Sequence, residues 1–262
     1  MLKLIGSRLI QMVFIMGVIS LILFAIFDSD KFKKQIAVAE LGGFAVSALS
    51  DQDYHAWLEK KGLNVPFFQR YRNWAAGLVR GDLGKSFEKN EPVLGLVAAR
   101  LANTGILAFW VFALMIPLSL TFGVIAGMKE GSFQDRLTSF ISVLTTSLPE
   151  IATAIILTVI FALGLRWLPA NAAMVNGWDW RALVLPALTL VLYDFGYVAR
   201  MTRASMAEVM SSQYIRTAVL KGLPYRRVIL RHALRNALIT PVTVIMLQIP
   251  WLMSGEIGRA HV

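Results

Sequence analysis

The stretch Thr104–Met128, TGILAFWVFALMIPLSLTFGVIAGM, contains no charged side chain from end to end. A hydrocarbon core of about 30 Å is crossed by about 20 apolar helical residues, so this stretch can span a bilayer. Its proline, Pro117, does not argue against a helix, because membrane helices tolerate proline where neighbouring groups satisfy the freed carbonyl. Four further runs qualify or nearly so: Leu9–Phe27, Phe140–Leu165, Leu183–Ala199 and Leu238–Met253. The sequence therefore predicts an all-α polytopic membrane helix bundle with about five transmembrane helices.

The composition narrows the class of protein further. Hydrophobic residues make up 56% of the 262 residues, and the net charge is +10. In a membrane protein this charge favours basic cytoplasmic loops and contact with anionic lipid over binding of nucleic acid. The chain has no cysteine, its three histidines are scattered, and it lacks a Gly-x-Ser-x-Gly motif. We therefore expect no catalytic residue, no metal and no cofactor.

The distribution of basic residues predicts the orientation in the membrane. Lys3 and Arg8 precede the first span, and many basic residues but only one acid, Glu208, lie between Arg200 and Arg235. Because short loops rich in Lys and Arg stay in the cytoplasm, we expect a cytoplasmic N-terminus. Residues 1–27 then form a retained N-terminal transmembrane anchor, since the apolar run is long and no small-x-small cleavage site precedes Asp28.

Residues 28–103 are expected on the extracytoplasmic side, with short helices. Ser50–Asp53 is typical of a helix start leading into Tyr54–Lys61, and Gly62 is a typical stop. Gly84-Lys85-Ser86 resembles the end of a phosphate-binding loop, but the first glycine of that motif is replaced by Val79. We therefore interpret this segment as a turn in an outer scaffold.

The stretch Gln213–Ala237, QYIRTAVLKGLPYRRVILRHALRNA, predicts a basic helical hairpin between two apolar spans. Its first helix should place Tyr214, Ile215, Ala218 and Val219 on one face. Gly222 supplies the stop, and Pro224 suits the first turn of the second helix, which spaces Arg227, Arg231 and Arg235 four apart. A folded cytoplasmic loop of this kind indicates a docking site for another protein.

This hairpin resembles the coupling loop of ATP-binding-cassette (ABC) importer permeases of the dipeptide and oligopeptide, binding-protein-dependent family. The matching positions are Tyr214, Arg216, Thr217, Ala218, Lys221, Gly222 and Leu223. The similarity continues through Arg231–Ala237. An outer signature, Gly81-Asp82-Leu83-Gly84-Lys85-Ser86, is similar to the Gly-Asp-Leu-Gly-x-Ser pattern of one member of the permease pair.

The resemblance implies a permease subunit that moves peptides or related small solutes by alternating access across a bacterial or archaeal cytoplasmic membrane. Residues 104–254 would form the permease core, and residues 200–236 its cytoplasmic coupling loop. The implied partners are a second permease subunit in a heterodimer, two ATPase subunits, an extracytoplasmic solute-binding protein and the lipid bilayer. ATP hydrolysis would take place on the ATPase subunits, and the seven matching hairpin residues would contact them.

Related permeases continue with a sixth span after a segment like Leu238–Met253. Residues 255–262 instead resemble the translation of a sequencing adapter. We expect a truncated reading frame with a non-native tail, and six transmembrane helices in the intact parent.

Pro149 and Glu150 are candidates for the translocation path. A charge at membrane depth is costly and usually faces a cavity or a partner. Glu150 could favour cationic or amine-bearing solutes, or it could be neutral or paired with another helix. Asp194, close in sequence to Arg200 and Arg203, is expected to form a local structural pair.

Two other classes of function stay open at this stage. A secondary, gradient-driven transporter would need inverted repeats and paired intramembrane charges, and the sequence has no evident repeat and few such charges. A non-transporting membrane assembly or interaction protein would also use a basic loop.

Overall fold

The computed structural model describes residues 2–86, 91–171 and 179–259, and helices dominate these ranges. Within them the only β-structure is an isolated antiparallel bridge between Lys85 and Pro92. The contacts divide the chain into two units, Met1–Ala99 and Arg100–Val262. The predicted all-α class is confirmed.

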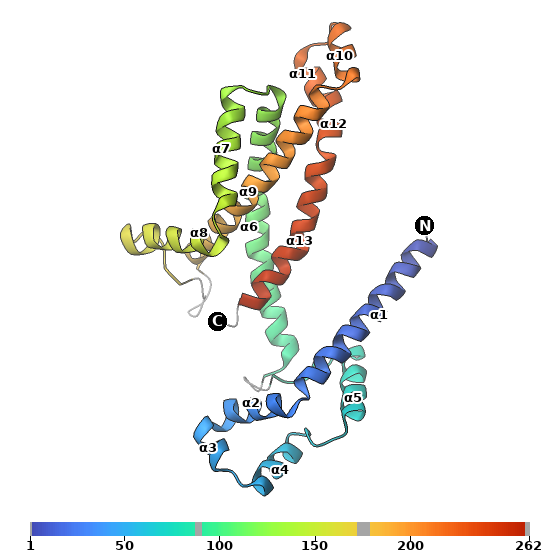
Figure 1. Cartoon of the computed structure of the whole chain (residues 1–262), viewed down its shortest axis with the longest axis vertical. Coiled ribbons are helices and arrows are strands. Elements are labelled where there is room, and N and C mark those ends of the chain that lie inside the picture. The colour runs from blue at the N-terminus through green and yellow to red at the C-terminus, as the bar shows by residue number, and fades with distance from the viewer. Residues whose placement is uncertain (1, 87–90, 172–178, 260–262) are drawn as a thin grey trace. The chain divides into compact units, whose positions relative to one another are not determined.

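The first unit begins with a long apolar helix followed by shorter helices (Figure 1). They are α1 (Leu2–Phe27), α2 (Asp30–Leu41), α3 (Gly43–Ala48), α4 (Asp51–Lys60) and α5 (Phe67–Val79). The Ser50 hydroxyl caps α4 by accepting a hydrogen bond from the backbone N–H of Asp53 at 3.2 Å. Gly62 follows α4 with a φ of +68°, a conformation that favours glycine. Both predicted helix signals are confirmed.

The second unit contains the remaining helices, the first of which starts at the end of the first unit. They are α6 (Val93–Met128), α7 (Phe133–Ser147), α8 (Glu150–Leu157), the π-helix η1 (Thr158–Gly164), α9 (Trp180–Met210), α10 (Gln213–Leu220), α11 (Tyr225–Arg227), the π-helix η2 (Val228–Ala233), α12 (Leu234–Ala237) and α13 (Ile239–Arg259). The described residues of both units contain 3 helices that are long and apolar enough to cross a membrane. The number rises to 5 if each of two bent helix pairs is counted as one span. This agrees with the prediction of about five.

The third predicted span, Phe140–Leu165, is not one straight helix. The helices on either side of residues 148 and 149 are bent by 98°. Pro149 causes the break, because it has no N–H to donate and holds Leu148 in an extended conformation with a ψ of 131°. The expectation of a continuous helix over Phe140–Leu165 was wrong at Pro149, whereas Pro117, Pro186 and Pro250 do lie inside helices.

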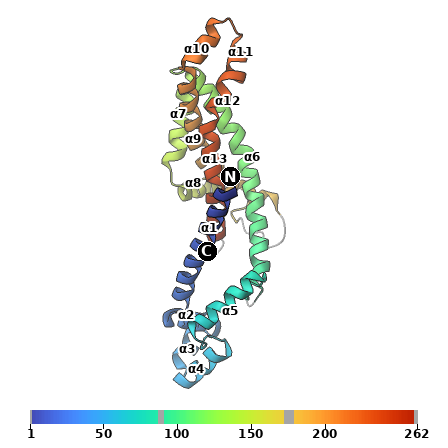
Figure 2. The same ribbon diagram turned by 90° about the vertical axis from the view of Figure 1, so that its right-hand side faces the viewer.

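Helix α9 is the centre of the second unit, with α6, α7 and α13 beside it (Figures 1 and 2). Small residues allow the close approach of these helices. A Cβ atom on Gly123 of α6 would lie 2.5 Å from the Thr202 Cβ, and one on Gly127 would lie 2.5 Å from the Arg203 carbonyl oxygen. At the contact between α9 and α7, a Cβ on Gly196 of α9 would lie 2.2 Å from the Thr145 Oγ1 of α7. Only glycine fits at these three contacts.

Candidate functional site

The turn of the hairpin is fixed by backbone hydrogen bonds. The Gly222 N–H donates to the Val219 carbonyl at 2.9 Å, and the Leu223 N–H donates to the Ala218 carbonyl at 3.4 Å. This pair of bonds is the Schellman arrangement that ends α10, and it places Gly222 at a φ of +72°. The predicted helix stop at Gly222 is confirmed. Nothing lies within 4 Å of a Cβ built there, so the backbone conformation, not a close neighbour, requires glycine.

The hairpin has a small apolar core of its own. It joins the C-terminal end of α9 to α10, η2 and α12, since its buried members are Met206, Ile215, Ala218, Val228, Ile229, Ala233 and Ala237. Leu223 packs against this cluster from the turn. The hairpin is therefore a packed element attached to α9, not a loose loop.

Ala218 lies inside this core with only 7% of its surface exposed. Its small size is explained by packing within the chain. Of the predicted face of α10, Ile215 and Ala218 are buried, whereas Tyr214 and Val219 are exposed. The prediction of one shared apolar face was therefore right for only half of its members.

The outward surface of the hairpin carries large apolar side chains. Leu220 is 81% exposed, and Val219, Tyr225 and Leu230 are also exposed. Arg216, Thr217 and Lys221 are exposed as well. Figure 1 shows α10 and α11 at one end of the second unit. An apolar surface with basic neighbours, outside the apolar spans, is typical of a docking surface for another protein.

The second limb of the hairpin is not a regular α-helix. It runs through α11, the π-helix η2 and α12, so the predicted regular spacing of Arg227, Arg231 and Arg235 is interrupted by wider turns. All three arginines are exposed. The Asn236 side-chain amide donates to the Tyr214 hydroxyl at 2.9 Å, which ties this limb to α10.

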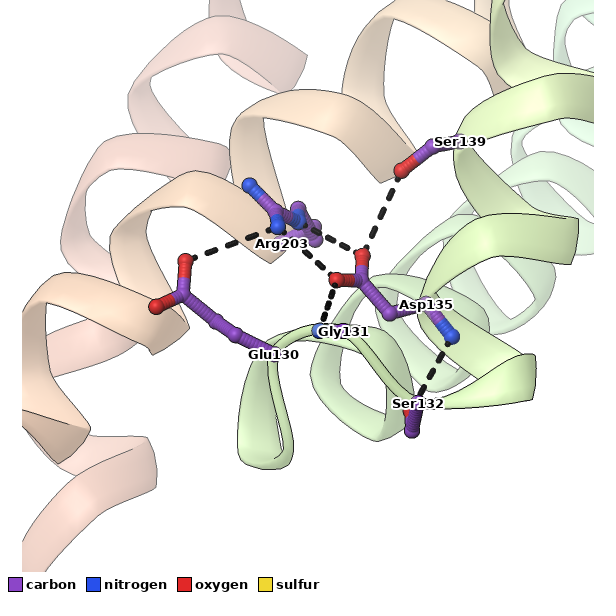
Figure 3. Close-up of polar contacts among 6 residues, drawn as sticks. All are labelled: Glu130, Gly131, Ser132, Asp135, Ser139 and Arg203. Carbon is purple, nitrogen blue, oxygen red and sulfur yellow. Dashed lines mark hydrogen bonds and ion pairs between the residues drawn. The ribbon is translucent and has the colours of Figure 1, made fainter.

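An ionic network lies where the α6–α7 turn meets α9 (Figure 3). The Arg203 guanidinium donates to both oxygens of Asp135, through Nε to Oδ1 at 2.8 Å and through Nη2 to Oδ2 at 2.9 Å. Glu130 adds a longer contact to the same guanidinium at 3.5 Å. Asp135 is 4% exposed, so this is a two-pronged pair with a buried carboxylate.

Asp135 also organises the start of α7 (Figure 3). It accepts a hydrogen bond from the Gly131 N–H at 2.9 Å, and its own N–H donates to the Ser132 hydroxyl at 3.3 Å. The Ser139 hydroxyl donates to Asp135 Oδ1 at 3.3 Å. One carboxylate therefore fixes a turn, a helix start and the neighbouring α9.

The structure corrects the expected pairing of Asp194. Its carboxylate accepts a hydrogen bond from the Gln248 amide of α13 at 3.0 Å, and Arg203 pairs with Asp135 instead. The reason is helix geometry: Asp194 is 1% exposed in the interior of the unit, whereas Arg200 is exposed.

Glu150 lies at the start of α8, directly after the exposed Pro149, and is half-buried. It lines a cavity of about 260 Å³ with residues of η1 and α9, including Thr158, Pro186 and Thr189. Pro149 does not line this cavity.

The sequence contains signals for two features that were not predicted from it. Gly123 and Gly127 form a small-x-x-x-small pattern inside an apolar run, which indicates helix–helix contact. Ser132 and Asp135 have the spacing of a helix-capping pair. No local pattern indicates that Arg203 would be the partner of Asp135.

Comparison with known proteins shows the family. Residues 119–258 match the family described as "Binding-protein-dependent transport system inner membrane component". The chain belongs to this family.

Members of the family with curated names support the same conclusion. The oligopeptide transport system permease protein AppB of Bacillus subtilis (strain 168) is 33% identical over 216 residues, covering 80% of this chain and 68% of the relative. The glutathione transport system permease protein GsiC of Escherichia coli O6:H1 is 34% identical over 199 residues, covering 76% of this chain and 64% of the relative. The predicted membership of the peptide-transport permeases is confirmed, and the two alternative classes are not favoured.

The family and the apolar helices together make the chain a multi-pass protein of the inner membrane. Of the predicted tail, residues 255–259 continue α13, and residues 260–262 lie outside the described residues.

Proposed function

We propose that this chain is the permease subunit of an ABC importer and moves peptides or related small solutes by alternating access. The names of its relatives, which include oligopeptide and glutathione permeases, support the substrate class. The observation that carries the proposal is the packed hairpin with an exposed apolar surface, joined to the central helix α9. A transporter driven by a separate ATPase needs such a rigid contact element. The conformational change of the ATPase takes place outside the membrane and must be transmitted to the transmembrane helices.

The partners follow from this role. A second permease subunit, in a heterodimer, would complete the pathway, two ATPase subunits would hydrolyse ATP, and an extracytoplasmic solute-binding protein would deliver the solute. The N-terminus and the hairpin lie in the cytoplasm in this proposal, since the loop around the hairpin is strongly basic. The translocating chain itself has no catalytic part.

The contact with the ATPase involves the exposed surface of the hairpin. We assign it to Tyr214, Arg216, Thr217, Lys221 and Gly222 among the predicted residues, together with the exposed Val219 and Leu220. Ala218 and Leu223 support this surface from inside.

The route from hairpin to spans uses contacts described above. The core of the hairpin contains Met206 of α9, and Arg203, one turn earlier, is bound to Asp135 of α7. A displacement of the hairpin would therefore move α9 and the cytoplasmic end of α7 together. The other end of α7 leads to the break at Pro149 and to the cavity at Glu150. Such rigid-body motion about packed interfaces is a known form of switching.

Cross-linking tests the ATPase contact. The chain has no cysteine, so single cysteines can be introduced on an unmodified background. Leu220→Cys, carrying a benzophenone maleimide in the assembled transporter, should cross-link to the ATPase subunit. Val79→Cys is a matched control, since Val79 is 88% exposed on α5 and Leu220 is 81% exposed. Absence of an ATPase product from Leu220→Cys, or its labelling from outside intact cells, would contradict the proposal.

We also propose that Glu150 faces the solute path and favours solutes with an amine group. The cavity and the partial exposure of Glu150 support this assignment. Glu150→Gln should lower uptake of amine-bearing peptides relative to N-acetylated peptides on the order of tenfold, as for loss of one partly buried ion pair. Competition uptake measures the ratio. An unchanged ratio would show that Glu150 has a structural role only.

A further inference from the structure

A cavity lies in the first unit, far along the chain from the hairpin and from Glu150. Its volume is about 1080 Å³. Most of its wall is apolar and comes from the end of α1, from α2 and from α5, and includes Leu23, Phe27, Ile36 and Trp74. A space of this size with an apolar wall suits a hydrocarbon chain.

The wall is held in shape by contacts between α1 and α5. The Ser20 and Tyr71 hydroxyls are hydrogen-bonded at 2.9 Å. The ring of Phe24 contacts the rings of Tyr71 at 5.4 Å and Trp74 at 5.9 Å between centroids. The Arg70 guanidinium lies 5.6 Å from the centroid of the same Phe24 ring. The cavity is therefore a built feature of this unit.

The polar part of the cavity is cationic. Lys61, Arg70 and Lys85 line it, and no carboxylate of the described residues does. Two nearby acids reduce this charge only in part, because Asp28 is shared between Arg70 and Lys33, and Glu40 pairs with Lys61 at 2.7 Å. Lys85 forms no ion pair within the described ranges. The cavity thus combines an apolar wall with an excess of positive charge.

The outer signature Gly81–Ser86 presents Lys85 to this cavity. The Asp82 N–H donates to the Gly77 carbonyl at 2.9 Å, and the Asp82 carboxylate accepts from the Gly84 N–H at 2.8 Å. Gly81 and Gly84 have φ values of +82° and +75°, which only glycine adopts readily. The Val93 N–H donates to the Gly84 carbonyl at 2.9 Å and closes the turn. The glycines of the signature therefore shape a turn whose Leu83 and Lys85 line the cavity.

The position along α1 indicates the depth of the cavity in the membrane. Its α1 residues, Ser20, Leu23, Phe24 and Phe27, belong to the last turns of the apolar span Lys3–Phe27. At about 1.5 Å per residue this span is about 37 Å long, so its last turns cross the boundary between hydrocarbon and headgroups. Trp74 and Tyr71 are side chains typical of that boundary.

We propose that this cavity binds an anionic phospholipid, with an acyl chain against α1 and Trp74 and the phosphate near Lys61, Arg70 and Lys85. The apolar wall is continuous with the exposed apolar surface of α1, which gives the lipid a route from the bilayer. The excess of positive charge selects an anionic headgroup over a zwitterionic one. This site is separate from the transport function proposed above.

Quenching of Trp74 by brominated lipid tests the proposal on the full chain in vesicles. Two vesicle types contain the same fraction of brominated lipid, either phosphatidylglycerol or phosphatidylcholine, in unlabelled phosphatidylcholine. The difference in quenching between the unmodified chain and Trp74→Phe gives the contribution of Trp74, separate from that of the other tryptophans. We expect this contribution to be larger with phosphatidylglycerol. Lys85→Gln should reduce the preference about fivefold, the effect of one basic residue near an anionic lipid.

Lys34→Gln is the matched control, because Lys34 is exposed on α2 of the same unit and does not line the cavity. It should keep the preference of the unmodified chain. The proposal is overturned if Trp74 contributes no quenching, or if the two brominated lipids quench Trp74 equally. It is also overturned if Lys34→Gln reduces the preference for phosphatidylglycerol as much as Lys85→Gln does. Relief of the quenching by millimolar inorganic phosphate would show a phosphate site without a lipid, and would also overturn it.

Discussion

Two helices of this permease, α1 and α9, are both apolar enough to cross a membrane, yet the chain surrounds them differently. None of the apolar stretch of α1 is buried within the chain, whereas 61% of that of α9 is buried. Helix α9 nevertheless carries fully buried polar side chains, Asp194 and Thr202, whereas Arg8 and Gln11 of α1 are exposed. Since lipid is as apolar as leucine, helices associate through small residues and polar contacts, and not through hydrophobicity. In this chain, polarity inside an apolar helix therefore indicates protein contact.

The largest expected effect comes from the closest contact of α9. In Gly196→Leu the new Cβ would lie 2.2 Å from Thr145 Oγ1 and 2.6 Å from the Ser142 carbonyl oxygen, so α7 and α9 must separate. We expect a loss of about 3 kcal/mol or more in the free energy of unfolding. Titration with sodium dodecyl sulfate, followed by circular dichroism, measures it.

The same change in α1 is the control. Gly17→Leu meets nothing within 4 Å, so it should leave stability unchanged or raise it by up to about 1 kcal/mol through helix propensity. Similar losses in the two variants would show that α9 is not packed more tightly than α1.

The next effect concerns the ionic network between Arg203 of α9 and Asp135 of α7. Asp135→Asn removes the charge that accepts two hydrogen bonds from Arg203 and leaves a partly buried guanidinium with the weaker Glu130 contact. We expect a loss of about 2 kcal/mol, measured by the same titration. Glu208→Gln is the control, because Glu208 is an exposed acid of α9 and its loss should change little. Equal losses in the two variants would show that the pair with Arg203 gives Asp135 no greater effect on stability than an exposed acid has.

Local signals predicted the turns of this molecule well. The cap at Ser50, the stop at Gly222 and the apolar lengths of the spans all depend on residues close together in the sequence. The bend at Pro149 was missed because proline alone does not say whether neighbours support a continuous helix. At Pro117 and Pro186 the helix continues, and at Pro149 it ends.

The partners of charged residues could not be predicted in the same way. Asp135 and Arg203 are 68 positions apart, and Asp194 and Gln248 are 54 positions apart, so only the packing of α7, α9 and α13 brings them together. The burial of Ala218 likewise depends on which side of α10 meets η2. For the candidate site, the sequence therefore predicted the hairpin and its turn. It did not predict the apolar core of the hairpin or the Asp135–Arg203 ion pair.

A smaller effect is expected where α9 meets α13. Gln248→Leu removes the amide that donates to the buried Asp194, which should cost about 1 kcal/mol in the free energy of unfolding. The matched change on α1 is Gln11→Leu, since Gln11 is exposed and only accepts a long 3.4 Å bond from Arg8. Detergent titration should show a loss for Gln248→Leu and none for Gln11→Leu. A reversed order would contradict the view that α9 depends on internal polar contacts.

The smallest effect sharpens the comparison from the side of α1. Its end is attached to α5 by the Ser20–Tyr71 hydrogen bond and by the ring contacts of Phe24. Tyr71→Phe keeps the ring but removes the hydroxyl, so we expect a loss of only about 0.6 kcal/mol, the average for such bonds between membrane helices. Ser20→Ala should give the same loss, and the double variant should lose no more than either single one. A double-mutant cycle in detergent measures this coupling. Additive losses would mean that the two hydroxyls act separately, and that aromatic contacts alone hold α1 to α5.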